Sequence, residues 1–407
     1  MKTTFLKISK FLLLLLVVSI NLREPYLHSR EILFFLFIIF SLPYGNYRNL
    51  FYMLLLLALS SISLLYNIII PGSNLLQGPW YQIIVNSAYL LLLVFCNKKY
   101  YQVIIKGYLI SAVIVSFITV VFWIICYNNQ EIRWAVFDYF NKMKELEGLT
   151  VLDVNVRLTL GYPFFFVYYR TSPIIIPALC YLYVKRLRGV RTRANFWGVI
   201  LFTVALILSG ARANILCAAL LMFFYNVFLL YKNKHLVIAT IVLIASICGG
   251  FNVANKFLND KGSNSSNIKK MHQEDYFKIY NSDYIRTFFF GWGCGSSFYS
   301  KGYGVKTQVT ELSHWETIRR YGVVSFLLIM FFIWLEPLIM KMRTERGVSK
   351  YFYVVIVLSY IFVACTNPFL IDSIGFCALL FFKSFFEYDT LNRNGYFQRR
   401  IISPRTA

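Results

Sequence analysis

The sequence predicts an all-α, polytopic integral membrane protein that forms a single domain over residues 1–407. Hydrophobic residues make up 58% of the chain and aromatic residues 19%, and the mean hydropathy is +0.60. Soluble domains have less apolar compositions. Apolar runs also recur from one end of the chain to the other, and most approach the roughly 20 residues that a helix needs to cross the hydrocarbon core.

Counting these runs predicts about twelve membrane-spanning helices. They lie near residues 5–21, 28–43, 49–70, 80–96, 102–126, 163–184, 196–210, 212–231, 236–256, 317–340, 351–370 and 373–387. The first run has a charged start but is not followed by a small-residue cleavage site, so we interpret it as a span rather than a cleaved signal peptide.

The short loops between the runs set the orientation, because cytoplasmic loops accumulate Lys and Arg. With both termini in the cytoplasm, the basic segments all fall on one side: 2–10, 48, 98–99, 185–193, 232–234, 341–350 and 393–405. This distribution accounts for the formal charge of +23 by topology and by anionic lipid headgroups. We therefore expect membrane lipids as partners and exclude nucleic acid.

Two long segments face outward in this frame, residues 127–162 and 257–316, and they hold most of the acidic residues. A polar segment between apolar helices lies in water at a membrane face or lines a cavity, so these loops are the natural place for a site. Within the second loop we expect a short amphipathic helix over 271–280.

Metal chemistry finds little support in the sequence. The eight cysteines are scattered, mostly inside apolar runs, with no spacing typical of a metal site or a disulfide framework. The outward loops contain no Asp-x-Asp pattern, and the cytoplasmic loops contain no cluster of acids. We predict neither a metal nor another cofactor.

Arginines outside the cytoplasmic loops are the candidate substrate-binding residues, because topology does not explain them and a guanidinium binds phosphate with a planar fork. The candidates are Arg157, Arg170, Arg212, Arg286, Arg319 and Arg320. Snorkelling of the side chain to the membrane interface is the alternative for Arg212 and for at least one of Arg319 and Arg320, and for Arg170 the alternative is a span that begins later in the chain. Arg212 follows Ser209-Gly210-Ala211, which predicts a tight turn between two apolar helices.

The second outward loop also carries the candidate catalytic residues. His314 titrates near neutral pH, and Glu311, three residues earlier, shares its face if the segment is helical. A helix-start acid and an ordinary interfacial histidine are the alternatives. The glycines of 291–295 form neither a dinucleotide-binding nor a Walker loop, so we expect them to allow close backbone approach.

Taken in order, several short motifs resemble the O-antigen (oligosaccharide repeat-unit) polymerases over residues 150–385. They are LSGAR at 208–212, GWGCG at 291–295, TELSHWE at 310–316, YG at 321–322 and TNPF at 366–369. The related O-antigen ligases usually have a His-Asn pair in the second large loop. This chain has Glu311-Leu312-Ser313-His314 instead, which favours the polymerases.

The resemblance implies a GT-C-like fold in the bacterial inner membrane and a metal-independent glycosyltransferase active on its outer face. The substrates would be oligosaccharides linked to undecaprenyl pyrophosphate, joined into O-antigen or capsular polysaccharide, and a chain-length regulator is a further candidate partner. The arginines would stabilise the leaving diphosphate, with Glu311 or His314 as general base.

Two other classes stay open at this stage. A lipid-linked oligosaccharide flippase or another transporter also has about twelve spans and intramembrane arginines, although it has no need of two long outward loops. A scaffolding membrane protein has no need of the outward arginines.

Overall fold

The computed structural model describes residues 2–22, 29–69, 87–147, 152–159, 162–233, 235, 238, 264–293, 296–307, 310, 312–345, 349–365 and 370–402. Within these residues the chain is mostly helical, as the sequence predicts. Two small antiparallel hairpins are the exceptions to the all-α expectation, and each has two strands.

The first half of the chain contains the following elements, with η marking short 3-10 turns. They are α1 (Lys2–Leu22), α2 (Ser29–Ser41), η1 (Leu42–Tyr44), η2 (Tyr47–Asn49), α3 (Leu50–Ile69), η4 (Leu91–Phe95), α5 (Tyr101–Asn128), α6 (Gln130–Glu147), β1 (Leu152–Thr159), β2 (Tyr162–Tyr169), η5 (Ser172–Ile174) and α7 (Ile175–Leu187). Strands β1 and β2 pair antiparallel, with Leu152 opposite Tyr169.

In the second half, η6 and η7 are π-helical turns. The elements are α8 (Arg193–Leu208), α9 (Arg212–Lys232), α11 (Asn264–Ser282), η6 (Arg286–Phe290), β3 (Phe298–Ser300), β4 (Val305–Thr307), α12 (Ser313–Tyr321), α13 (Val323–Ile329), η7 (Met330–Leu335), α14 (Glu336–Thr344), α15 (Ser349–Cys365) and α16 (Ser373–Ile402).

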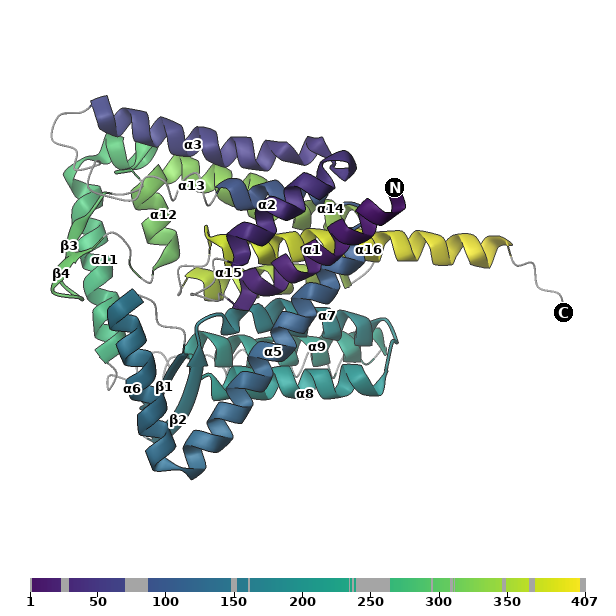
Figure 1. Ribbon diagram of the computed structural model, residues 1–407, viewed down its shortest axis with the longest axis horizontal. Helices are drawn as coiled ribbons and strands as arrows, with labels where there is room; N and C mark the ends of the chain where they lie inside the picture. The colour runs from purple at the N-terminus through teal and green to yellow at the C-terminus, as the bar shows by residue number, and fades with distance from the viewer. Residues whose placement is uncertain are drawn as a thin grey trace.

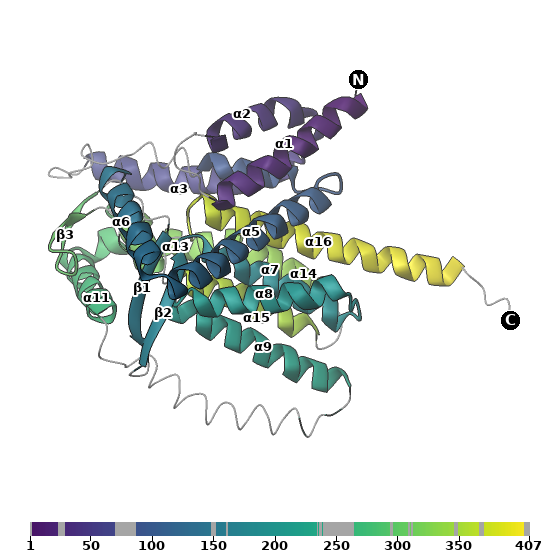
Figure 2. The same ribbon diagram turned by 60° about the horizontal axis from the view of Figure 1, so that its bottom comes forward.

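Helix α16 lies at the centre of the bundle, where it contacts α1, α5, α7 and α14 (Figures 1 and 2). Residues 376–382 are all buried, so this part of the helix has no exposed side. A helix that is apolar on every side packs in the interior of a protein, because it has no polar face to turn outward. The remaining apolar helices are arranged around it.

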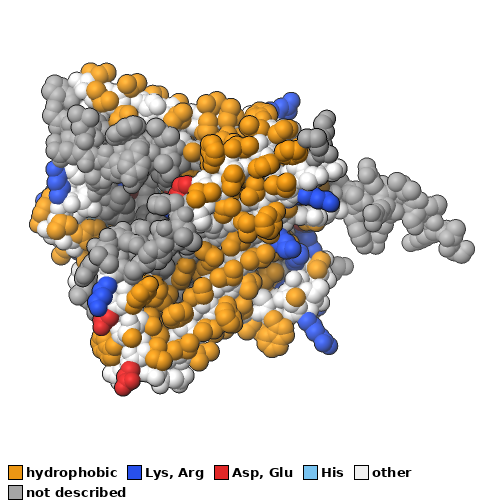
Figure 3. Space-filling view, viewed as in Figure 1, with side chains coloured by type: hydrophobic (Ala, Val, Ile, Leu, Met, Phe, Trp, Pro, Cys, Tyr) orange, Lys and Arg blue, Asp and Glu red, His pale blue; other side chains and the backbone are white. Residues whose placement is uncertain are grey.

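The outer surface of the bundle is apolar. Large hydrophobic side chains remain exposed on the outer helices, among them Phe11, Leu65 and Phe117, which are 60%, 58% and 62% exposed. Figure 3 shows one face of the molecule, on which hydrophobic side chains cover much of the described surface and several Lys and Arg side chains lie at the end near the termini. An apolar surface of this extent is suited to acyl chains rather than water.

Five helices in the described part of the chain are long and apolar enough to cross a membrane. They are Thr3–Leu22, Tyr47–Ile69, Tyr101–Asn128, Arg212–Lys232 and Val323–Thr344. Arg193–Leu208 and Lys350–Cys365 are apolar but shorter. The structure therefore fits a helical membrane protein but does not support the count of about twelve spans.

The expected span at 163–184 is wrong in its first half, where residues 162–169 form strand β2. This segment reads Pro-Phe-Phe-Phe-Val-Tyr-Tyr, and aromatic and β-branched residues favour strands when a partner strand lies beside them. The expected span at 28–43 contains only the 13-residue α2, which is shorter than a span requires. Almost all of the expected span at 236–256 lies outside the described residues.

Both long loops are largely folded. Residues 127–162 contain α6 and the β1 strand, and residues 257–316 contain α11, η6 and the β3–β4 hairpin. Helix α11 confirms the expected helix at 271–280 but begins earlier, at Asn264. Figures 1 and 2 show α6, α11 and both hairpins at one end of the molecule, and the two termini at the other. The predicted frame likewise places both termini on one side of the membrane and both long loops on the other.

Candidate anion-binding site

Arg286 begins the π-helical turn η6, which packs against α3, α12 and α13. Asp283 starts this turn, because its carboxylate accepts a hydrogen bond from Arg286 N (3.0 Å) and its carbonyl accepts one from Thr287 N (3.0 Å). Asp is favoured at the start of helical turns since its side chain satisfies a free N–H group. The sequence around 283–286 therefore fixes the backbone position of Arg286.

The Arg286 side chain is 8% exposed and has three neighbours of different kinds. Its Nη2 donates a hydrogen bond to the Oδ1 of Asn67 on α3. Its Cζ lies 3.9 Å from the centre of the Trp292 ring, a favourable cation–π geometry. Its Nε is buried and has no hydrogen-bond partner among the described residues.

No carboxylate in the described part of the chain forms an ion pair with Arg286. Burial lowers the pKa of its guanidinium and Asp283 partly offsets this effect, but an arginine stays charged in a protein. A buried charge without a counter-ion is costly, and such groups are uncommon unless a ligand meets them. The arrangement is thus suited to binding an anion, which would reach the guanidinium beside the partly exposed Trp292.

The segment that holds Trp292 is fastened to the end of α12. Trp292 N donates to the carbonyl of Arg319 (2.5 Å), and Gly293 N donates to the carbonyl of Arg320 (3.1 Å). Gly291 and Gly322 make this approach possible, with φ values of 68° and 88° that side chains rarely adopt. A Cβ on Gly291 would lie 2.6 Å from the Arg320 carbonyl carbon. The expected close backbone approach at 291–295 is confirmed at Gly291.

A second set of charges lies on α12 itself and is neutralised within the protein. Glu316 is buried and accepts from Arg319 Nε (2.9 Å), Arg319 Nη2 (2.6 Å) and Arg320 Nε (2.5 Å). Tyr276 of α11 donates to the same carboxylate (2.7 Å). Arg319 also donates to the carbonyl and hydroxyl oxygens of Ser296. These contacts tie α11, α12 and the 296 region together.

Burial alone would raise the pKa of the Glu316 carboxyl, but the charges of Arg319 and Arg320 outweigh it and the pKa falls below its usual value. Glu316 is therefore a bound anion and not a proton acceptor. Burial would lower the pKa of the Arg319 guanidinium, but the charge of Glu316 outweighs burial and the pKa rises. Arg319 is engaged by protein groups, so Arg286 is the better candidate for binding the substrate. The predicted role of Arg319 in substrate binding stays a prediction.

His314 lies on the opposite face of α12 from this cluster, because residues on a helix are about 100° apart and Glu316 follows two positions later. The ring is half-buried, and its Nδ1 lies 3.3 Å from the carbonyl of Cys365 at the end of α15. Burial lowers the pKa of the imidazole, with the Cys365 carbonyl acting in the other direction. His314 is consequently neutral at neutral pH and able to accept a proton.

Arg170 and Arg212 lie on other elements, in two segments that contact each other. Arg170 follows β2, and Arg212 is the first residue of α9; both are half-buried. Asn214 of α9 donates to the Ser172 hydroxyl (2.8 Å), which joins the two segments. The predicted tight turn before Arg212 is confirmed, with Gly210 at φ 62° packed against Phe166. Helix α15 packs against α9, η5 and α12, so it lies between these arginines and the α12 region.

Two other predicted residues are less completely described. Arg157 lies on β1 with its backbone opposite Phe164, and only its backbone is described. Glu311 and the 366–369 motif lie outside the described residues. The structure thus groups Arg286 with Arg319 and Arg170 with Arg212, on two different sets of elements.

A further charged cluster lies at the end that carries the termini, and the sequence did not indicate it. Buried Lys341 of α14 contacts Asp389 of α16 (2.6 Å) and Glu345 (3.3 Å), and Arg188 also pairs with Asp389. Nearby, Lys383 of α16 contacts Glu336 (3.4 Å) and the hydroxyl of Tyr52 (2.8 Å). The sequence does not indicate this cluster, because pairing between distant segments leaves no local pattern.

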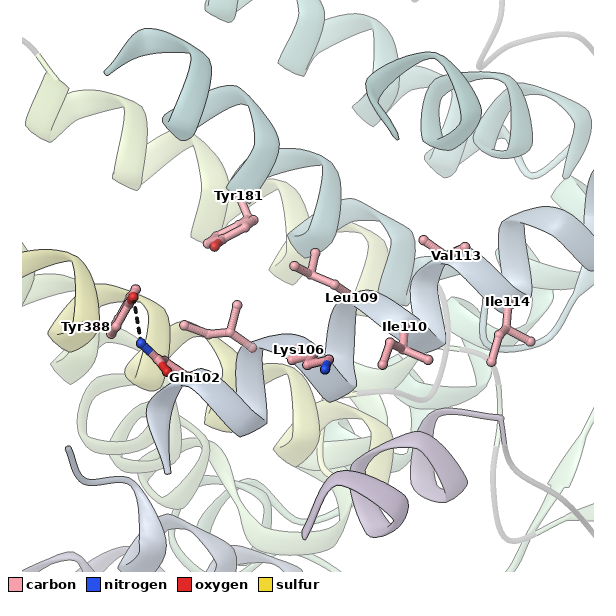
Figure 4. Close-up of a pocket in the computed structure, with 9 residues that line it drawn as sticks. Gln102, Lys106, Leu109, Ile110, Val113, Ile114, Tyr181 and Tyr388 are labelled. Carbon is pink, nitrogen blue, oxygen red and sulfur yellow. Dashed lines mark hydrogen bonds between the residues drawn. The ribbon is translucent and has the colours of Figure 1, made fainter. Parts of the chain in front are cut away.

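Two cavities in the described structure lie away from Arg286. One, of about 290 Å³, is lined by charged residues of the second cluster, including Lys341, Lys383 and Glu336. The other, of about 380 Å³, is an apolar groove along α5 (Figure 4). Tyr181 of α7 lines it, and Gln102 donates to Tyr388 at one end (3.0 Å). Few polar groups converge in this groove, so it is poorly suited to catalysis.

Among the described residues, no group of three or more His, Cys, Asp or Glu side chains is placed to hold a metal ion. Six cysteines in that part of the chain are free thiols, and five of them are buried. Comparison with known proteins adds no assignment: no family model matches the chain, and no curated protein matches it either.

Proposed function

We propose that this chain is a glycosyltransferase that polymerises oligosaccharide repeat units linked to undecaprenyl pyrophosphate. In this proposal it acts on the outer face of the bacterial inner membrane and produces O-antigen or capsular polysaccharide. A chain-length regulator is the protein partner we would expect. The proposal rests on the motif resemblance between 208 and 369 and on the chemistry of the anion-binding site.

The observation that carries the proposal furthest is the buried Arg286, which forms no ion pair with a carboxylate of the described residues. A lipid-linked donor carries a diphosphate, whose oxygens match the donor groups of a guanidinium. A diphosphate is also an activated leaving group, and its charge grows as the glycosidic bond breaks. A fixed cation lowers the barrier when it meets developing charge, and it does so without a metal ion.

The chemistry divides among the named residues as follows. The acceptor hydroxyl attacks the anomeric carbon of the donor sugar, and the bond from that carbon to the diphosphate oxygen breaks with its electron pair. Arg286 binds the departing diphosphate. The proton of the attacking hydroxyl passes to a base, for which His314, neutral at neutral pH, and Glu311 are the candidates.

The proposed architecture is GT-C-like, with about twelve spans and both termini in the cytoplasm. Five long and two shorter apolar helices in the described residues support a multi-span protein. The position of both folded loops at the end away from the termini supports placing the site on the outer face (Figure 2).

Glycan length in a deletion strain tests the function and separates it from its alternatives. Loss of a polymerase leaves lipid that carries a single repeat unit, as seen on a gel ladder. Loss of a ligase leaves bare lipid core, with polymer still attached to undecaprenyl pyrophosphate. Loss of a flippase traps the units inside the cell. A normal ladder in the deletion strain, or either of the last two patterns, rejects the polymerase proposal.

A further inference from the structure

Asn67 is the direct polar partner of Arg286, and its orientation is fixed. It lies near the end of α3 and is fully buried. Its Nδ2 donates to the carbonyls of Ser63 (2.7 Å) and Gly291 (3.0 Å). With both N–H groups used in this way, the amide has one orientation, and its Oδ1 faces the Nη2 of Arg286.

The chemical type of this partner determines the charge of the site. An aspartate at position 67 would form a charge-assisted ion pair with Arg286 and neutralise it. An asparagine of the same shape accepts the same hydrogen bond but leaves the positive charge in place. The buried Glu316 on α12 shows the opposite case, because its carboxylate neutralises Arg319 and Arg320.

The hydrogen bonds of Asn67 also control where the guanidinium points. One nitrogen is held by Asn67, one face lies against the Trp292 ring, and the buried Nε has no partner in the described structure. Buried donors are almost always satisfied, and a ligand with acceptor oxygens is one partner that would satisfy this N–H group. Ser63 strengthens the same connection, since its hydroxyl donates to the Arg320 carbonyl (2.6 Å).

We propose that Asn67 is a positioning residue that aims Arg286 and preserves its charge, so that the two together form the unit that binds a diphosphate. The proposal rests on the proposed function for the identity of the diphosphate, and it adds that α3 supplies half of the binding unit. A purely structural Asn67 would only fasten α3 to the 291 segment, and the experiment below separates the two roles.

The test uses the purified full-length protein and inorganic pyrophosphate as the probe, with binding measured by calorimetry and folding by thermal unfolding. Asn67→Asp should abolish detectable binding, because an internal carboxylate then occupies the arginine. Asn67→Ala keeps the cation but frees it to move, and should weaken binding about tenfold. In an Arg286→Ala background, Asn67→Ala should have no further effect on binding, as expected for residues that act through one another.

Asn226→Asp is the matched control. Asn226 makes the same bond to the carbonyl four residues earlier (2.9 Å to Met222), but it is exposed and far along α9. It should bind pyrophosphate like the unchanged protein. If Asn67→Asp or Asn67→Ala binds pyrophosphate with unchanged affinity, the positioning role is rejected. If the unchanged protein does not bind it, the diphosphate unit itself is rejected.

The two proposals fail separately. Pyrophosphate binding that depends on Asn67 and Arg286, together with a normal glycan ladder in the deletion strain, would reject the polymerase function and retain the anion site. Should Asn67→Asp fail to fold, the comparison of Asn67→Ala with Arg286→Ala still decides the question, because it needs no new charge.

Discussion

At the scale of single residues, the site is defined by which arginines the protein neutralises. Arg319 is engaged by Glu316 and Ser296, whereas Arg286 faces an amide oxygen and an indole ring. Both are buried to a similar extent. Burial alone therefore does not separate a structural arginine from a binding one, and the identity of the partner does.

Lysine should not replace the binding arginine. We expect Arg286→Lys to lose bidentate contacts worth roughly 1.5–3 kcal/mol, or about tenfold to hundredfold in rate if they act in the transition state. The measurement is the glycan ladder at matched protein levels. Arg193→Ala is the control, because Arg193 is an exposed residue at the start of α8. A wild-type ladder from Arg286→Lys would end the diphosphate-binding hypothesis.

His314 should give the protein a pH-dependent stability. Its pKa is lowered from 6.5 by burial, so the unfolded chain binds its proton more readily than the folded chain. Stability from this residue is then present above the ordinary pKa and is lost as the pH falls through 6.5 toward the folded value. Thermal unfolding between pH 5 and 8 measures the effect, which should be smaller in His314→Gln. An equal pH dependence in both proteins would contradict this assignment.

At the scale of elements, α12 is a short helix whose charged side chains connect α11 with the segment at Ser296. Removing the carboxylate of Glu316 would leave Arg319 buried without its counter-ion. We therefore expect Glu316→Gln to destabilise the protein by roughly 3–5 kcal/mol. Denaturant unfolding checks this value. Glu274→Gln on the exposed side of α11 should change stability by less than about 0.5 kcal/mol, and an equal loss in both variants would remove the special role of Glu316.

The glycine at the end of α12 offers a second test at this scale. Gly322→Ala combines a left-handed φ of 88° with a new Cβ 2.8 Å from the Phe289 carbonyl carbon. Gly189 has nearly the same φ, 87°, but open space around it. Gly189→Ala thus measures the backbone strain alone, roughly 1 kcal/mol, and Gly322→Ala should lose clearly more. Similar losses would show that the close contact between segments is unimportant.

Sequence patterns predicted some of these elements and not others, for physical reasons. The turn at Gly210 was predictable because glycine and a charged residue interrupt an apolar run. Strand β2 was not, because an apolar aromatic segment reads the same whether it crosses a membrane or pairs with a strand. Asn67 was also missed: a single amide within an apolar helix carries no local signal, and its partner lies more than two hundred residues further on.

At the scale of the whole molecule, the termini lie at one end and the folded loops at the other (Figure 1). Basic residues at the terminal end predict that this end is cytoplasmic. Reporter fusions should therefore be active inside the cell at Asn233 and outside it in the 127–162 and 257–316 loops. Activity outside at Asn233 would reverse the frame and place Arg286 on the wrong side for the proposed reaction.

Helix α3 connects the anion-binding site with the charged cluster at the terminal end of the molecule. Tyr52, near its first turn, donates to Glu336 (2.7 Å) in the charged cluster at the terminal end, and Asn67, near its last turn, holds Arg286. The 15 residue steps from one to the other cover roughly 22 Å of a continuous helix. Because α3 is held by polar contacts near both ends, it cannot shift along its axis without breaking the contacts at one of them. The lengthwise position of α3 is thus set jointly by the charged cluster at one of its ends and the anion-binding site at the other.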